Sequence, residues 1–201
     1  MSDFRNLLHH HVHQQGAGPA ATFWAGLGAI RREALLELGG FDEARYPRAS
    51  IEDVELGARL FRKGGRILLD PAIQGKHLKT WTLPGMVATD LLDRGVPWVR
   101  MMLADRAHST VLNLGWRHRT GAGAAIALLA ALARRNFRLA AGLAVLLFAI
   151  DSSFYGLLWR RRGAKLVAAG IPLQLVHRLT SAAAVPVALT AHLFGKPPRH
   201  G

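Results

Sequence analysis

Acidic residues are nearly absent from the second half of this chain, and this feature constrains the fold more than any other. Residues 106–201 contain 13 Lys and Arg residues but a single acid, Asp151, whereas residues 1–105 contain 13 Lys and Arg residues and 12 Asp and Glu residues. The basic residues of the second half stand at the ends of runs rich in Ala, Leu, Val and Gly, as they do in helices at membranes. The sequence therefore predicts a charge-balanced first region and a basic, apolar second region.

The second region predicts three apolar membrane helices. Their approximate bounds are 113–133, 137–159 and 166–195. The uninterrupted apolar runs 121–133 and 137–150 are each shorter than the ~20 residues that a straight bilayer span needs. A two-helix hairpin is the simplest arrangement of these two runs.

The segment 82–105, at the end of the first region, has a different pattern. Its apolar faces are interrupted by Asp90, Asp93 and Arg94, which is typical of amphipathic helices that lie on a bilayer surface. An ordinary pair of surface helices on a soluble core fits the same periodicity equally well. The predicted organisation is thus 1–81, then interfacial helices at 82–105, then the membrane helices of 106–201.

Composition narrows the classes of function. The net charge of +13 is compatible with nucleic-acid binding, but the arginines bracket apolar runs instead of forming a basic patch, so we expect membrane lipids and not nucleic acid as partners. There is no cysteine, so any metal would need His or carboxylate ligands. The first residues show no apolar run of signal-peptide type, and we expect the first region on the cytoplasmic side.

An acidic pair after a double glycine is the leading candidate for chemistry. Gly39 and Gly40 end a predicted helix, and Glu52 and Asp53 fall in the first turn of the next one, where the helix dipole favours an ionised carboxylate. A positioned carboxylate can act as a general base. The alternative is helix capping, with Ser50 as the capping residue.

Other residues of the first region are weaker candidates. His77 lies after a strand-like segment and beside Lys79 and Trp81, so it can contact a phosphate or complete a metal site, although lone histidines are usually structural. His9 and His13 are one helical turn apart, but a packed or solvated histidine run is the favoured interpretation. Short strands are predicted at 22–24, 66–70 and 73–77.

Four motifs taken together resemble the C-terminal half of the family 2 glycosyltransferases. They are Trp24 to Arg32, Gly39-Gly40-Phe41-Asp42-Glu43, Glu52-Asp53 with Arg59, and His77-Leu78-Lys79-Thr80-Trp81. The resemblance implies a partial α/β domain of the GT-A type (nucleotide-diphospho-sugar transferase) in the first region, followed by an α-helical membrane region, with helix dominating overall.

The resemblance also implies roles for individual residues. Asp53 would be the general base that deprotonates the acceptor hydroxyl, and Glu52 would support it. The implied substrate-binding residues are Trp24, Gly26, Gly28, Arg59, Lys79 and Trp81. Members of the family use a divalent metal, Mg²⁺ or Mn²⁺, and His77 would complete its site.

The chain departs from the family pattern in two places. The Gln-x-x-Arg-Trp signature of processive members is absent, which argues against long-chain synthesis. The Asp-x-Asp motif that supplies the main metal ligands is also absent. We therefore expect the donor site to be contributed by a separate N-terminal half.

These observations predict a membrane-associated inverting glycosyltransferase, or its C-terminal half. It would transfer a sugar from a nucleotide-sugar to a lipid-linked or glycan acceptor at the cytoplasmic face of a bacterial cytoplasmic membrane. The alternative is a catalytically inactive fragment or scaffold membrane protein that lacks the donor-binding half.

Overall fold

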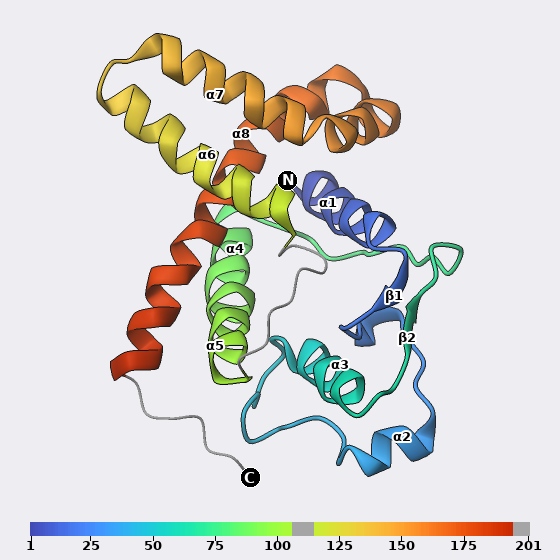
Figure 1. The fold of residues 1–201 in the computed structure, drawn as a ribbon. Coiled ribbons are helices and arrows are strands. Elements are labelled where there is room, and N and C mark those ends of the chain that lie inside the picture. Colours follow the sequence, from blue (N-terminus) through green and yellow to red (C-terminus); the bar gives the residue numbers. More distant parts are fainter. Residues whose placement is uncertain (106–114, 195–201) are drawn as a thin grey trace.

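The computed structural model describes residues 1–105 and 115–194, and helix dominates it (Figure 1). The first part contains α1 (Ser2–Gln15), β1 (Gly18–Ala20), the short 3-10 helix η1 (Ala25–Leu27), α2 (Arg32–Glu37), α3 (Glu52–Arg62), β2 (Ile67–Leu69), α4 (Leu83–Ala88), the π-helix η2 (Thr89–Gly95) and α5 (Val96–Asp105). The second part contains α6 (Trp116–Ala133), α7 (Phe137–Ile150) and α8 (Ser152–Phe194).

The expected predominance of helix is confirmed, but the predicted α/β domain of the GT-A type is wrong. Helices make up 71% of the described residues, and the strands they contain form a single two-stranded sheet. In it β1 pairs antiparallel with β2, with Gly18 opposite Leu69 and Ala20 opposite Ile67. An α/β domain needs parallel strands with helices on their faces, and this two-stranded ribbon does not provide them.

The predicted strands fail for local reasons. Segments 22–24 and 73–77 form no strand, and of 66–70 only the three residues of β2 do. Segment 22–24 leads directly into the tight turn of η1, and Pro71 follows β2 and cannot donate a ladder hydrogen bond. Short apolar runs do not distinguish a strand from an extended segment packed on a helix.

The second part consists of long helices. Helices α6 and α7 form an antiparallel hairpin at one end of the molecule, and α8 then runs back beside α4, η2 and α5 (Figure 1). The helical path of α8 is broken at Gly163, whose φ is 70°. The predicted helices 113–133 and 166–195 begin or end just outside the described residues.

Among the described residues, no single helix has both the length and the apolar composition to cross a membrane. By these two criteria alone, α7 and α8 qualify only as a pair, and the pair is bent by 66°.

A shared core joins the two parts. Phe4 of α1, Met86 of α4, and Phe154 and Leu158 of α8 are fully buried in one cluster with Trp81. Burial of such side chains contributes about 1.5–3 kcal/mol each. The first region is therefore packed against α8 and not suspended from it by a linker.

Candidate active site

Asp53 is held in a fixed position by two backbone amides. Its Oδ2 accepts a hydrogen bond from the Ala25 amide at 3.0 Å, and its Oδ1 accepts one from the Val54 amide at 2.8 Å. A carboxylate offers about four acceptor positions, so two remain for another partner. The contact with Ala25 ties the start of α3 to η1, 28 residues earlier in the chain.

Close packing brings α3 to this position. A Cβ atom on Gly57 would lie 2.2 Å from the backbone nitrogen of Phe23, so only glycine allows the helix to approach segment 22–25 this closely. The amphipathic α3 buries Leu56 and Glu55 on the same side. The local sequence therefore places Asp53 beside η1.

The environment of Asp53 favours its protonated form. Burial raises the pKa of Asp53 and outweighs the two backbone hydrogen bonds, which lower it, and the charge of Glu52 raises it further while that of Arg94 lowers it. A carboxylate whose pKa is shifted towards neutrality is better matched to proton transfer near neutral pH. Position and pKa together fit a general base.

Ser50 does not form the expected N-terminal cap of α3. The Glu52 Oε2 accepts from the Ser50 amide at 2.6 Å, but the Ser50 hydroxyl donates to the Asp93 carbonyl. Residue Ile51 takes the N-terminal capping position without a side-chain hydrogen bond. Glu52 thus orders the entry to α3, while Ser50 connects it to η2.

A small pocket of about 190 Å³ is lined by Trp24 and Gly26, the chain neighbours of Ala25, whereas Asp53 is not among its lining residues. The full lining consists of Trp24, Gly26, Leu27, Gly75, Lys76 and His77. A Cβ atom on Gly26 would lie 2.6 Å from the Trp24 ring, so the indole folds over this glycine. The structure thus brings three predicted site residues, Trp24, Gly26 and His77, to one pocket.

Imidazole rings form one side of this site. The ring centroid of His9 lies 4.4 Å from that of His13, 4.8 Å from that of Trp24 and 5.4 Å from that of His77. Burial lowers the pKa of His9 to about 3, and the charges of His13, Arg94, Arg5 and His77 lower it further. His9 is therefore neutral at physiological pH, and the rings form an uncharged aromatic surface beside Trp24.

Asn6 of α1 holds the His77 loop. Its amide nitrogen donates to the carbonyls of His77 and Lys79 at 3.1 Å, and its oxygen lies 2.9 Å from both His77 Nδ1 and Trp81 Nε1. Trp81 is buried in the shared core, and the Lys79 ammonium lies 4.1 Å from the Trp81 ring centroid. Trp81 and Lys79 therefore contact each other at the loop base and do not line the pocket.

Arg59 and Gly28 also lie outside the pocket lining. The Arg59 guanidinium pairs with Glu55 at 2.8 Å and donates to the carbonyls of Leu38 and Gly40 at 2.5 and 2.7 Å. It fixes the double-glycine turn against α3. Gly28 follows η1 in extended conformation.

Sequence reasoning missed Arg94. This half-buried residue lies on the π-helix η2, and its charge interacts with those of Asp53, Asp90, Asp93 and Arg5. Burial lowers the pKa of Arg94. A π-helical turn often marks a functional site, but it has no sequence pattern that predicts it, so only the structure shows that Arg94 belongs near Asp53.

His77 is the residue predicted to complete a divalent metal site. In the residues described, no three His, Asp or Glu side chains are arranged to hold a metal ion, and the Nδ1 atom of His77 is engaged by Asn6. The described residues thus supply no partner ligands for His77, and the Mg²⁺ or Mn²⁺ site stays a prediction from the resemblance.

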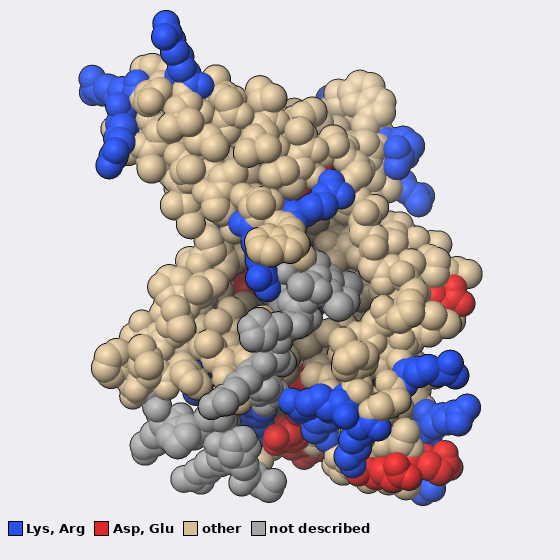
Figure 2. Space-filling view, in the orientation of Figure 1, with Lys and Arg blue, Asp and Glu red and all other residues tan. Residues whose placement is uncertain are grey.

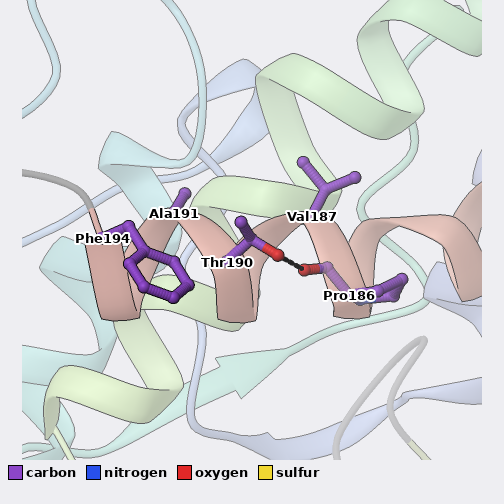
Figure 3. A pocket seen from close by; sticks show the side chains of 5 residues that line it. All are labelled: Pro186, Val187, Thr190, Ala191 and Phe194. Atoms are coloured by element: carbon purple, nitrogen blue, oxygen red, sulfur yellow. Dashed lines mark hydrogen bonds between the residues drawn. The ribbon is translucent and has the colours of Figure 1, made fainter.

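A second hollow, of about 610 Å³, lies along the end of α8 (Figure 3). Its lining consists of Pro186, Val187, Thr190, Ala191 and Phe194. The Thr190 hydroxyl donates to the Pro186 carbonyl at 2.9 Å. None of these side chains is titratable, so this open apolar surface offers no catalytic chemistry.

Comparisons of the chain with family models, with curated proteins and with solved structures find no match. The likeness to family 2 glycosyltransferases therefore stays a prediction from the motifs.

Proposed function

We propose that this chain is the acceptor-side part of a membrane-associated inverting glycosyltransferase in which Asp53 is the general base. The observation that supports this best is the fixed Asp53 carboxylate, whose pKa is raised by burial. It accepts a hydrogen bond from the amide of Ala25, the residue between Trp24 and Gly26. Trp24 and Gly26 line the adjacent pocket. A carboxylate next to an aromatic surface is a common requirement for binding and activating a sugar hydroxyl.

The proposed reaction is a single displacement. A free oxygen lone pair of Asp53 accepts the proton of the acceptor hydroxyl, and that hydroxyl oxygen forms a bond to the anomeric carbon of the donor sugar. The bond from that carbon to the phosphate oxygen breaks, and the nucleoside diphosphate leaves with the electron pair. Attack from the face opposite the leaving group inverts the anomeric configuration.

The pocket volume limits which part of the two substrates this chain can hold. Its volume of about 190 Å³ is below the ~300–1,000 Å³ typical of small-molecule sites, so it suits a group of about one sugar ring. The nucleotide diphosphate would then be bound by a separate N-terminal half. Lys76 in the pocket lining supplies a positive charge.

The alternative function is a non-catalytic scaffold at the membrane. It is favoured by the sequence, which lacks the Asp-x-Asp motif of the family's donor site. The two functions differ in one measurable respect, because a transferase must interact with a nucleotide-sugar and a scaffold need not.

The experiment compares two tryptophan substitutions. Membranes from cells that express the full chain together with the separate N-terminal half receive labelled uridine- or guanosine-diphosphate sugars, and label is measured in extracted lipid and glycan. We expect Trp24→Ala to lower transfer about tenfold, as loss of about 1.4 kcal/mol of ring contact implies. The matched control Trp159→Ala, at a 61% exposed position on α8, retains transfer.

Thermal unfolding of both variants accompanies the assay, because Trp24 also contacts His9 and His13. Equal transfer by wild type and a folded Trp24→Ala variant contradicts the proposed site. Absence of transfer by wild type in membranes that also contain the separate N-terminal half supports the scaffold instead.

A further inference from the structure

The second part of the molecule exposes no acidic side chain in the range 116–194. Its one acid, Asp151, is 8% exposed and accepts bonds from the Arg178 guanidinium at 2.6 and 2.9 Å. The surface of this part therefore carries only positive formal charges. In Figure 2 the acidic side chains of this face gather over the first region, whereas the region of α6 and α7 shows basic and uncharged atoms.

The α6–α7 hairpin also exposes large apolar side chains. They are Ile126, Leu129, Leu132, Phe137, Leu139, Val145, Leu146 and Phe148, each at least 44% exposed. Small residues such as Ala125 and Ala140 fill the contact between the two helices, so the larger side chains point away from it. An exposed apolar surface of this extent marks a binding surface for another apolar phase.

Three exposed arginines cluster at the hairpin turn. Arg134 and Arg135 form the connection between the helices, and Arg138 lies in the first turn of α7. In the described part of the chain, no hydrogen bond or ion pair holds any of their guanidinium groups. Figure 2 shows basic side chains projecting from this end of the molecule, at its upper left.

The backbone at this turn makes the arginine cluster unusual. Arg135 has a φ of 55°, and no other non-glycine residue in the described ranges has a positive φ. Its amide donates to the Leu132 carbonyl at 2.9 Å, and the Asn136 amide donates to the Ala131 carbonyl at 2.8 Å. This is a helix-ending turn in which glycine is the most stable residue. An arginine here is less favourable for folding, and no contact within the described chain offsets that cost.

We propose that the α6–α7 hairpin binds bilayers that contain anionic phospholipid, through its apolar side chains and the turn arginines Arg134, Arg135 and Arg138. The apolar side chains enter the acyl region, and the guanidinium groups pair with lipid phosphates and the negative surface charge. Guanidinium forms bidentate hydrogen bonds with phosphate. Each basic residue near an anionic membrane surface contributes about fivefold to binding.

This inference extends the membrane association of the proposed function by naming the lipid class. Its test uses no sugar donor, so failure of lipid binding and failure of sugar transfer are separate results. Nucleic acid also carries phosphates, but it has no apolar phase to cover the exposed side chains of α6 and α7.

The test measures flotation of the purified full chain with vesicles. One set contains phosphatidylcholine only, and the other contains phosphatidylglycerol at about one third of the lipid. We expect the triple variant Arg134→Gln, Arg135→Gln, Arg138→Gln to bind the anionic vesicles about 100-fold more weakly than wild type. The control Arg31→Gln, Arg32→Gln, Arg66→Gln removes the same charge from exposed positions of the first region and should keep most of the binding.

A single substitution separates lipid binding from folding. Arg135→Gly places glycine at the positive φ, so its melting temperature should rise, while its binding to anionic vesicles should fall about fivefold. A merely structural role would move both measurements in the same direction.

Three results would overturn the inference. They are equal binding of wild type to both vesicle types, equal losses in the turn and control variants, and a turn variant that loses binding to a short RNA while retaining vesicle binding.

Discussion

The two regions of this molecule are stabilised in different ways. In residues 1–105 the elements are short, and polar side chains fix the backbone: Asn6 holds the His77 loop, Arg59 holds the double-glycine turn, and Asp53 holds η1. In residues 116–194 the helices are long, and the α6–α7 contact is made of alanine and leucine side chains. A region of the first kind can position chemical groups, whereas one of the second kind offers a surface.

The most damaging substitution should be one that separates the two regions. Asp90 of η2 accepts a bond from Arg5 of α1 at 2.5 Å and lies 2.8 Å from the His177 ring nitrogen of α8, all buried. Asp90→Asn leaves the Arg5 guanidinium buried without a counter-charge, and we expect a loss of about 3–5 kcal/mol in the free energy of unfolding. Chemical denaturation measures it.

Asp93→Asn is the matched control on the same π-helix. Within the described residues its ion pair is with Arg48, 3.9 Å away at the surface, so the loss should stay below about 1 kcal/mol. Equal losses for the two variants would show that the buried network does not join the regions. Burial alone would raise the pKa of Asp90, but the His177 bond and the Arg5 charge outweigh it and lower the pKa, so this stabilisation is lost only in strong acid.

Two Gly→Ala substitutions, one in each region, should change the stability of the fold in opposite directions. Gly57→Ala would place a Cβ atom against the Phe23 backbone and should destabilise the chain by about 1–3 kcal/mol. Gly123→Ala, in α6, meets no atom within 4 Å and should stabilise by about 0.5–1 kcal/mol. Melting temperatures measure both, and a destabilising Gly123→Ala would contradict the account of the hairpin.

The imidazole surface should make the first region sensitive to mild acid. His9 is neutral in the fold because its pKa is lowered to about 3, while in the unfolded chain it takes up a proton near pH 6.5. The unfolded state therefore binds more protons between these two values, and stability falls as the pH drops below about 6.5. We expect His9→Phe to reduce the loss of stability between pH 7.5 and 5.5, measured by denaturation. If His9→Phe loses as much stability as wild type over this pH range, the His9 ring is in contact with water and the explanation is wrong.

The sequence predicted the parts of this molecule that depend on neighbours in the chain. The helix before Gly39 and the helix from Glu52 to about Lys63 follow from apolar spacing and glycine ends, and both are close to α2 and α3. The α/β architecture was wrong because three short apolar runs, 22–24, 66–70 and 73–77, carry no information about their pairing.

The candidate site was partly predictable for the same reason. Motif spacing identified Asp53, Trp24, Gly26 and His77, which the fold brings near one another. Asn6 and the packing of His9 depend on contacts with the distant His77 loop. The position of Arg94 depends on a π-helical turn. Arg59 and Trp81 lie away from the pocket because of other long-range contacts. Arg59 binds the carbonyls of Leu38 and Gly40, and Trp81 packs in the shared core.

The most direct measurement is sugar transfer by an Asp53→Asn variant of the full chain, in membranes that also contain the separate N-terminal half, beside the control Glu33→Gln at an exposed position on α2. We expect a loss of about 10²- to 10⁴-fold in rate, as removal of a general base implies. The melting temperature should be equal or higher, because a carboxylate whose pKa is raised by burial costs stability when ionised and asparagine removes that cost. Normal transfer by a folded Asp53→Asn chain would contradict the account.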